Sequence, residues 1–158
     1  MRFVRWVFCA ACVLAVGACS SVPYAQRQAQ LLAEYTAAAG APVQSFRFLL
    51  SLYSWVPLSN TELAVYTRPN KAWLLDVDGG CPALTYTQSI GITSYLNQVT
   101  TNFDKVLTGR HDFPCTITRI RPLDITQLKA AQKARRQIHT EPRPTQGAKS
   151  SEDTGSPG

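Results

Sequence analysis

The N-terminal segment constrains the fold most, because it decides how much of the chain is left to form a domain. Two arginines, Arg2 and Arg5, precede an apolar run of 13 residues from Trp6 to Ala18. Such a run is too short to cross a hydrocarbon core as a helix, which takes about 20 residues. Positive charge, a short apolar run and small residues at its end are typical of a secretory signal. We therefore predict that residues 1–18 are a signal peptide.

The end of this segment, Val16-Gly17-Ala18-Cys19, resembles the lipobox of bacterial lipoproteins. The resemblance implies that a diacylglycerol thioether forms on Cys19, that cleavage follows Ala18 and that the new amino terminus is acylated. Several acyl chains together give stable membrane anchoring. Ser20 follows the cysteine, which in Gram-negative lipoproteins favours the periplasmic face of the outer membrane. The alternative is an ordinary signal peptide in which Cys19 has no special role.

Processing would leave two cysteines in the folding chain. Cys9 and Cys12 lie in the signal and Cys19 would carry lipid, so only Cys81 and Cys115 of the five cysteines remain. Exported proteins fold in an oxidising compartment. We therefore predict a disulfide between Cys81 and Cys115, worth roughly 3–4 kcal/mol in the chain-entropy account.

The mature chain would keep 140 of the 158 residues, which suits one domain. Its net charge would fall from +6 to +4, and the charge is uneven, because residues 45–100 are neutral and residues 101–136 are basic. In an exported protein, a basic region favours anionic lipid or cell-wall polymers over nucleic acid. The candidate contacts with an anionic surface are Arg119, Arg121, Lys129, Lys133, Arg135 and Arg136. A solvated basic face without a partner is the alternative.

Alternation with a period of two predicts short strands from residue 45 onwards. The clearest pair is a hairpin of residues 62–67 and 72–77, joined by the turn Arg68-Pro69-Asn70-Lys71. In its first strand Leu63 and Val65 face one side, and Ala64 and Tyr66 face the other. Further strands are predicted at residues 45–53, 89–94, 103–107 and 115–121, with a turn at 55–60, a single helical turn within 81–87 and a loop or hairpin tip at 97–102. The alternation of the last strand slips between Ile117 and Ile120, which indicates a bulge or an edge position.

Two helices are predicted to flank the strands. Residues 24–39 are rich in helix formers and end before Gly40 and Pro42. This helix is either a spacer between membrane and domain or a docked first helix of the domain. The second helix follows Pro122, with Asp124 as its cap and Gln127 completing a capping box.

These elements predict an α+β domain: a small curled antiparallel sheet or partly open β-barrel with a C-terminal covering helix. The expected divisions are a signal peptide (1–18), the lipidated cysteine and helical spacer (19–44), a disulfide-bonded β-rich domain (45–137) and a disordered tail (138–158). The tail is expected to be disordered because it holds almost no apolar residues.

The chain also resembles a known group of proteins. The segments Trp55-Val56-Pro57-Leu58 and Phe103-Asp104-Lys105-Val106, together with the two cysteines in register with the strands, are similar to small proteobacterial lipoproteins known only as a domain of unknown function. The resemblance covers residues 45–125. It supports a two-cysteine domain and implies no activity, cofactor or catalytic residue.

No catalytic or metal-binding set stands out. Asp76-Val77-Asp78-Gly79-Gly80 begins like a calcium loop but lacks the acid or amide at its fifth position and the glutamate at its twelfth. Because Cys9-Ala10-Ala11-Cys12 would leave with the signal peptide, the mature chain would have two histidines and no CxxC motif, which are too few ligands for a structural zinc site. We therefore expect no metal and no cofactor. A possible binding face for sugar or peptide consists of Trp55, Tyr66 and Trp73, although aromatic residues at strand spacing more often belong to a core.

The predicted function is that of a non-enzymatic, membrane-anchored envelope lipoprotein that binds an envelope protein or polymer. One alternative is an enzyme acting on cell wall or lipid, with Asp104, His111 or Asp112 at its site. A pocket that gathers these residues would favour this alternative. Another is an inhibitor or accessory subunit of an envelope complex that presents Trp55 and Trp73, which requires an exposed apolar patch.

Overall fold

The computed structural model describes residues 23–49, 51–79, 81–109 and 112–140, the side chains of 138–140 excepted. The predicted signal peptide, the lipidation of Cys19, the candidate base His111 and the tail beyond residue 140 lie outside these residues.

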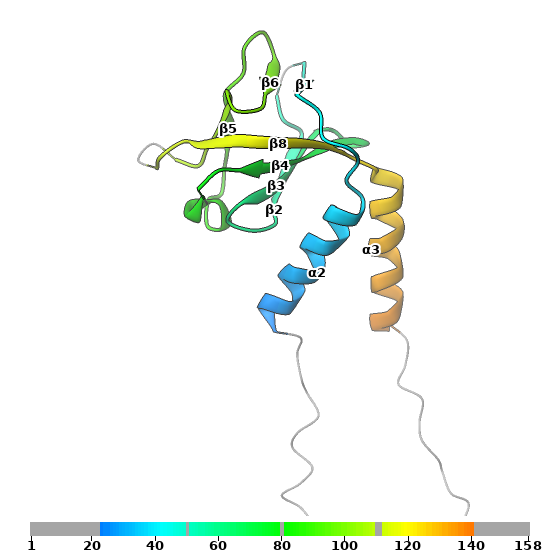
Figure 1. Cartoon of the computed structure of the whole chain (residues 1–158). Coiled ribbons are helices and arrows are strands. Elements are labelled where there is room, and N and C mark those ends of the chain that lie inside the picture. The colour runs from blue at the N-terminus through cyan, green and yellow to red at the C-terminus, as the bar shows by residue number, and fades with distance from the viewer. Residues whose placement is uncertain (1–22, 50, 80, 110–111, 141–158) are drawn as a thin grey trace, which may run out of the picture.

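The centre of the molecule is a curled, six-stranded antiparallel sheet (Figure 1). The strand order is β2-β3-β4-β8-β7-β5, and a second sheet pairs β1 with β6. The strands are β1 (Ser45–Arg47), β2 (Ser54–Pro57), β3 (Glu62–Arg68), β4 (Lys71–Val77), β5 (Gly91–Ile92), β6 (Gln98–Thr100), β7 (Lys105–Leu107) and β8 (Cys115–Leu123). The helices are α2 (Tyr24–Ala37), the 3-10 turn η2 (Pro82–Thr85) and α3 (Ile125–Thr140). The predicted α+β class is confirmed.

The sheet is covered on both faces, because β3 and β4 bury residues of both parities. Leu63, Val65 and Leu75 pack toward the small β1–β6 sheet, whereas Ala64 and Leu74 pack toward the helices. All five side chains are fully buried. The predicted hairpin and the predicted division of its side chains between two faces are both correct.

The layer toward the small sheet contains the disulfide. Cys81 and Cys115 are bonded across 34 residues, with Cα atoms 5.9 Å apart, which confirms the predicted pairing. Phe46 of β1 and Val99 of β6 pair with each other and enter the same hydrophobic layer. The disulfide and the small sheet therefore close one side of the main sheet.

The helices cover the other face (Figure 1). Of the two alternatives for residues 24–39, the structure has the docked helix. Tyr35 of α2 is buried beside Leu128 of α3, and Arg135 forms an ion pair with Glu34 at 3.2 Å. Helix α2 is therefore part of the folded unit, which begins before residue 45.

The start of α3 is capped by Asp124. Its Oδ1 accepts hydrogen bonds from the backbone N–H groups of Thr126 and Gln127, at 2.9 and 3.0 Å. A capping box would also have the Gln127 side chain accept a hydrogen bond from the Asp124 N–H, and this bond does not form. The Gln127 side-chain amide donates instead to the carbonyl of Ala37, and the Asp124 N–H donates to the carbonyl of Ala38. Both bonds tie the start of α3 to the end of α2.

Two loop predictions and one strand prediction are wrong in part. The strand expected over 45–53 ends at Arg47, because Leu49 and Tyr53 are exposed and do not continue the buried pattern. The turn expected at 55–60 contains β2, in which Pro57 is tolerated because β2 is an edge strand.

The loop expected at 97–102 contains β6, whose polar Gln98 bonds to Arg47 and Ser45 of β1. The bulge predicted in the last strand is correct. Register with β4 shifts where Asp76 pairs with Arg119 and Val77 pairs with Ile117. The alternative prediction, that this strand is at an edge of the sheet, is wrong, since β8 lies between β4 and β7.

Candidate functional site

The aromatic residues of the predicted binding face do not share one surface. Trp55 and Trp73 both flank Val65 in register and pack on the layer that faces the small sheet. The Trp73 ring stacks on Phe46, with centroids 5.1 Å apart. Tyr66 lies on the helix side. The two tryptophans are half-buried and form part of the core boundary.

On the helix side, the Tyr66 hydroxyl shares a hydrogen bond of 3.0 Å with that of Tyr35. Burial, followed by this hydrogen bond, raises the pKa of the Tyr35 phenol well above its ordinary value. The pair links α2 to the sheet, so the role of Tyr66 in the structure is to hold the helix.

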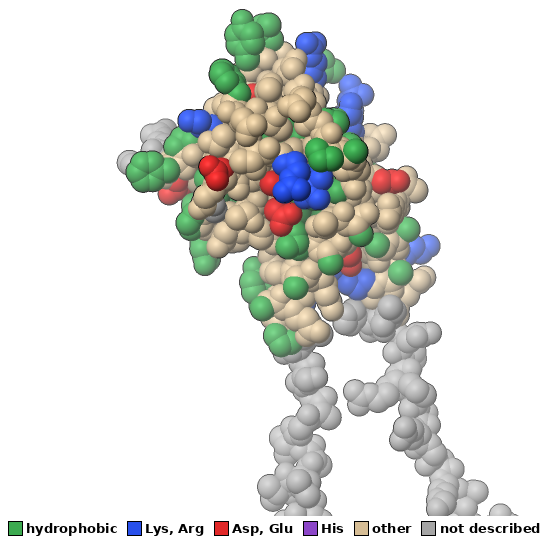
Figure 2. Space-filling view, in the orientation of Figure 1, with side chains coloured by type: hydrophobic (Ala, Val, Ile, Leu, Met, Phe, Trp, Pro, Cys, Tyr) green, Lys and Arg blue, Asp and Glu red, His purple; other side chains and the backbone are tan. Residues whose placement is uncertain are grey.

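Much of the predicted basic surface is taken up by ion pairs. Arg119 Nε lies 2.8 Å from Asp76 Oδ2, and Arg121 Nη2 lies 3.0 Å from Asp76 Oδ1 and 3.4 Å from Glu62 Oε1. Arg135 is paired with Glu34. Lys129, Lys133 and Arg136 remain exposed on α3. Figure 2 shows basic and acidic side chains interspersed over the viewed face instead of one large patch of a single sign.

The acidic residues of the enzyme alternative have structural roles. Asp104 is only 3 % exposed. It accepts hydrogen bonds from the Thr93 hydroxyl at 2.8 Å and the Thr100 N–H at 2.7 Å. Asp112 is exposed and accepts from the Thr108 hydroxyl at 3.1 Å. Asp112 lines a hollow of about 340 Å³ beside the disulfide, and Asp104 does not.

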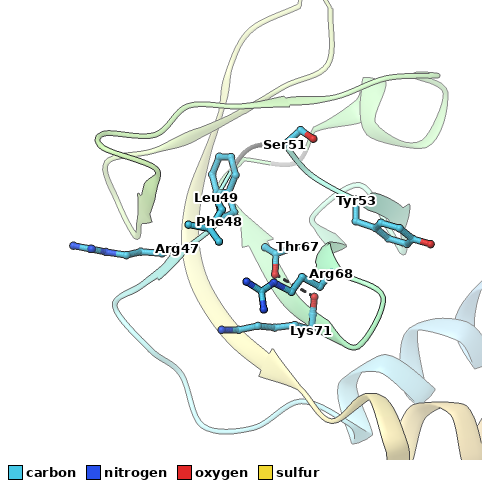
Figure 3. A pocket seen from close by; sticks show the side chains of 8 residues that line it. All are labelled: Arg47, Phe48, Leu49, Ser51, Tyr53, Thr67, Arg68 and Lys71. Carbon is cyan, nitrogen blue, oxygen red and sulfur yellow. Dashed lines mark hydrogen bonds between the residues drawn. The ribbon is translucent and has the colours of Figure 1, made fainter.

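A different hollow has the chemistry of a binding site. It has a volume of about 380 Å³ and lies between the segment that follows β1 and the β3–β4 turn (Figure 3). Its lining residues are Arg47, Phe48, Leu49, Ser51, Tyr53, Thr67, Arg68 and Lys71. We call it the cationic hollow, because three of these eight side chains are positively charged and none is acidic.

The local fold places the cations of this hollow. Arg68 and Lys71 are cross-strand partners at the end of the β3–β4 hairpin. Figure 3 shows their side chains extending in the same direction, with Arg47 on the far side and pointing away. The ammonium of Lys71 lies 5.6 Å from the Trp73 ring centroid, within cation–π range. Arg47 Nε donates to Gln98 Oε1 at 3.2 Å.

Sequence reasoning missed this hollow because it counted charges along the chain. Residues 45–100 are neutral since Arg47, Arg68 and Lys71 balance Glu62, Asp76 and Asp78. In the fold, Glu62 and Asp76 turn to Arg119 and Arg121 on β8, and Asp78 lies at the opposite end of β4. The two basic residues around Pro69-Asn70 were the only available signal, and they were interpreted as turn residues.

The part of the chain that the structure describes contains no cluster of three or more His, Cys, Asp or Glu side chains suited to a metal ion. Within the same residues, none of the helices combines the length and apolar character needed to span a membrane.

One comparison with known proteins gives a match. A family of unknown function, DUF6491, matches residues 2–139. The chain belongs to this family. The match includes the N-terminal apolar segment, helix α2, the described strands and α3 up to residue 139. It confirms the predicted relation to a domain of unknown function. Searches of curated proteins and of solved structures find no match.

Proposed function

We propose that this member of the DUF6491 family is a lipid-anchored protein of the bacterial envelope that binds another envelope component and catalyses no reaction. The observation that carries the proposal is the position of the chain ends. The N-terminal end of α2 and the C-terminal end of α3 lie at the same end of the molecule, and the sheets lie at the other (Figure 1). An anchor on the N-terminal side would therefore leave the sheets free for a partner.

The distance between anchor and domain is short. Cys19 precedes Tyr24, the first residue of α2, by five positions. Five residues span at most about 18 Å when fully extended. A lipid on Cys19 would keep the free ends of the helices close to the membrane surface. The cationic hollow, on the small-sheet side, would then face the periplasm.

Binding is favoured over catalysis by what lines the cationic hollow. Its hydroxyl groups are those of Ser51, Thr67 and Tyr53, and its lining includes no histidine, cysteine or carboxylate that could act as their base. The Thr67 hydroxyl donates to the carbonyl of Lys71 at 3.3 Å. These groups can hold an anion but are not arranged to activate a nucleophile.

Metabolic labelling with palmitate in a Gram-negative host tests the anchor. We expect the wild-type chain to take up label and to fractionate with the outer membrane, and Cys19→Ser to do neither. Cys81→Ser is the matched control, because it removes another cysteine and should leave labelling intact. Equal labelling of Cys19→Ser and wild type would rule out the proposed anchor.

Crosslinking in intact membranes tests the binding function. The wild-type chain should give a specific crosslinked species that Cys81→Ser weakens, because the disulfide supports the fold on the side that carries the hollow. A membrane-bound wild-type chain that crosslinks to nothing specific would contradict the binding function while leaving the anchor in place.

A further inference from the structure

We propose that the cationic hollow binds a phosphate group carried by an envelope ligand. The proposal deepens the binding function above by naming the chemistry of the ligand, and it rests on that function only for the ligand's place in the envelope. The hollow itself can be tested on purified protein, without an anchor.

The first argument is the contrast between two pairs of basic residues. Arg119 and Arg121 lie within 2.8–3.4 Å of carboxylates, which neutralise them. Arg68 and Lys71 take part in no ion pair among the residues that the structure describes, and no acidic side chain lines their hollow. Adjacent like charges repel each other, and an anion between them would remove the repulsion.

The second argument is that these two cations are arranged for a shared ligand. Arg68 and Lys71 are opposite each other on the hairpin and extend the same way (Figure 3). A guanidinium binds two oxygens of one anion with its planar fork, and an ammonium adds a compact point charge. A phosphate monoester offers three acceptor oxygens and up to two negative charges to this pair, whereas a carboxylate offers two oxygens and one charge, so the pair favours phosphate.

The third argument is the remainder of the lining. Tyr53 is 63 % exposed and Leu49 is 72 % exposed, and both line the hollow. Leu49 and Tyr53 contribute apolar surface to the lining, which the group that carries the phosphate can contact. Ser51 adds a hydroxyl donor to the lining, at a distance from the charged ends of Arg68 and Lys71 (Figure 3). The hollow therefore combines charge, a hydrogen-bond donor and an apolar wall, which suits a phosphorylated organic group better than a free ion.

The site is open to solvent, so its affinity should depend on salt. Exposed charge pairs are screened over about 8 Å at physiological ionic strength. We therefore expect binding to weaken as sodium chloride is raised, and the tests below are compared at one fixed ionic strength.

The experiment is a calorimetric titration of the full chain, purified in a non-ionic detergent that is removed before the vesicle titrations. The probes are inorganic phosphate, glucose 1-phosphate and acetate, together with vesicles of phosphatidylcholine containing phosphatidylglycerol. We expect saturable binding of glucose 1-phosphate, weaker binding of inorganic phosphate and no measurable binding of acetate. Saturation by glucose 1-phosphate identifies a sugar phosphate as the source. Binding of the anionic vesicles alone, lost with the hollow's cations, identifies a lipid headgroup.

The variant that tests the site is the double substitution Arg68→Gln and Lys71→Gln. Its matched control is Lys129→Gln with Lys133→Gln, which removes the same charge from the exposed surface of α3. We expect at least about tenfold weaker binding for the first variant, which is about 1.4 kcal/mol, and less than about a twofold change for the second. Far-ultraviolet circular dichroism should show both variants folded.

Three results would overturn the proposal: equal weakening by both double variants, acetate binding as tight as that of phosphate, or no saturable binding of any phosphate probe. Because these measurements do not depend on the lipid proposed on Cys19, they fail independently of the palmitate experiment. A phosphate site without an anchor, or an anchor without a phosphate site, would each be recognised.

Discussion

The two faces of the main sheet are stabilised by different means. On the helix face the sheet is covered by two helices and by charged groups that pair across strands, with Asp76 between Arg119 and Arg121. On the other face it is covered by two short strands and a disulfide, with Cys81 and Cys115 both buried. On the helix face, Arg119 and Arg121 are held in ion pairs. Arg68 and Lys71, at the end of the β3–β4 hairpin, form no ion pair among the described residues.

This difference bears on the proposed phosphate site. The small sheet has only three residues in each strand, so it contributes few backbone hydrogen bonds. The covalent bond between β8 and the segment before η2 compensates for that thin cover. Arg68 and Lys71 form no ion pair among the described residues, which would leave them available to the proposed ligand.

The sharpest test of the comparison uses two neighbouring leucines of β4. Leu74 faces the helices, Leu75 faces the small sheet, and both are completely buried. We expect Leu74→Ala and Leu75→Ala each to lower the free energy of unfolding by roughly 3–5 kcal/mol, measured by urea denaturation. A small loss at Leu75 alone would show that the thinner layer is not a true core.

The second test removes the disulfide. Replacing both Cys81 and Cys115 by serine should lower the free energy of unfolding by about 3–4 kcal/mol, because the unfolded chain is no longer constrained. Reduction of the wild-type protein with dithiothreitol serves as the matched control and should give a similar loss. Mass spectrometry without reductant should find neither thiol free. An unchanged midpoint in both experiments would mean that the helix face alone determines stability.

The third and smallest effect separates paired from available cations. Arg121→Gln should cost about 2 kcal/mol, because it leaves two partly buried carboxylates with weaker partners. Arg68→Gln should change the free energy of unfolding by less than about 0.5 kcal/mol, since its side chain is exposed. Thermal denaturation at neutral pH compares the two. A larger loss at Arg68 would show that its role is structural and would count against the phosphate site.

Much of the fold follows from local pattern. The β3–β4 hairpin, the disulfide, the bulge in β8 and the Asp124 cap are each specified by residues within a few positions or by the cysteine count. The short strands β2 and β6 are not specified by local pattern, because they form only by pairing with β3 and β1. The polar side chain of Gln98 predicts a loop, and only its hydrogen bonds with Ser45 and Arg47 of β1 explain why it lies in a strand.

The candidate site was harder to predict than the fold. Trp55, Tyr66 and Trp73 were predicted to form one binding face, although the alternation of β3 already put Tyr66 on the side opposite Val65. In the structure the two tryptophans share a layer, and Tyr66 lies on the helix side with Tyr35. The basic residues of β8 were counted as available because their carboxylate partners are more than 40 positions away in the chain. The order of the strands decides which cations are paired with carboxylates and which are not. That order depends on contacts between distant parts of the chain and cannot be predicted from local pattern.

The segment that joins α2 to β1 has a further consequence for the protein at high concentration. Gly40 N–H donates to Pro122 O and Val43 N–H donates to Ile120 O, so the segment covers the side of β8 that β7 does not reach. The strands left at the margins of the main sheet are β2, which has four residues and a proline, and β5, which has two. Margins this short give another copy little backbone to pair with. The fold therefore resists edge-to-edge aggregation.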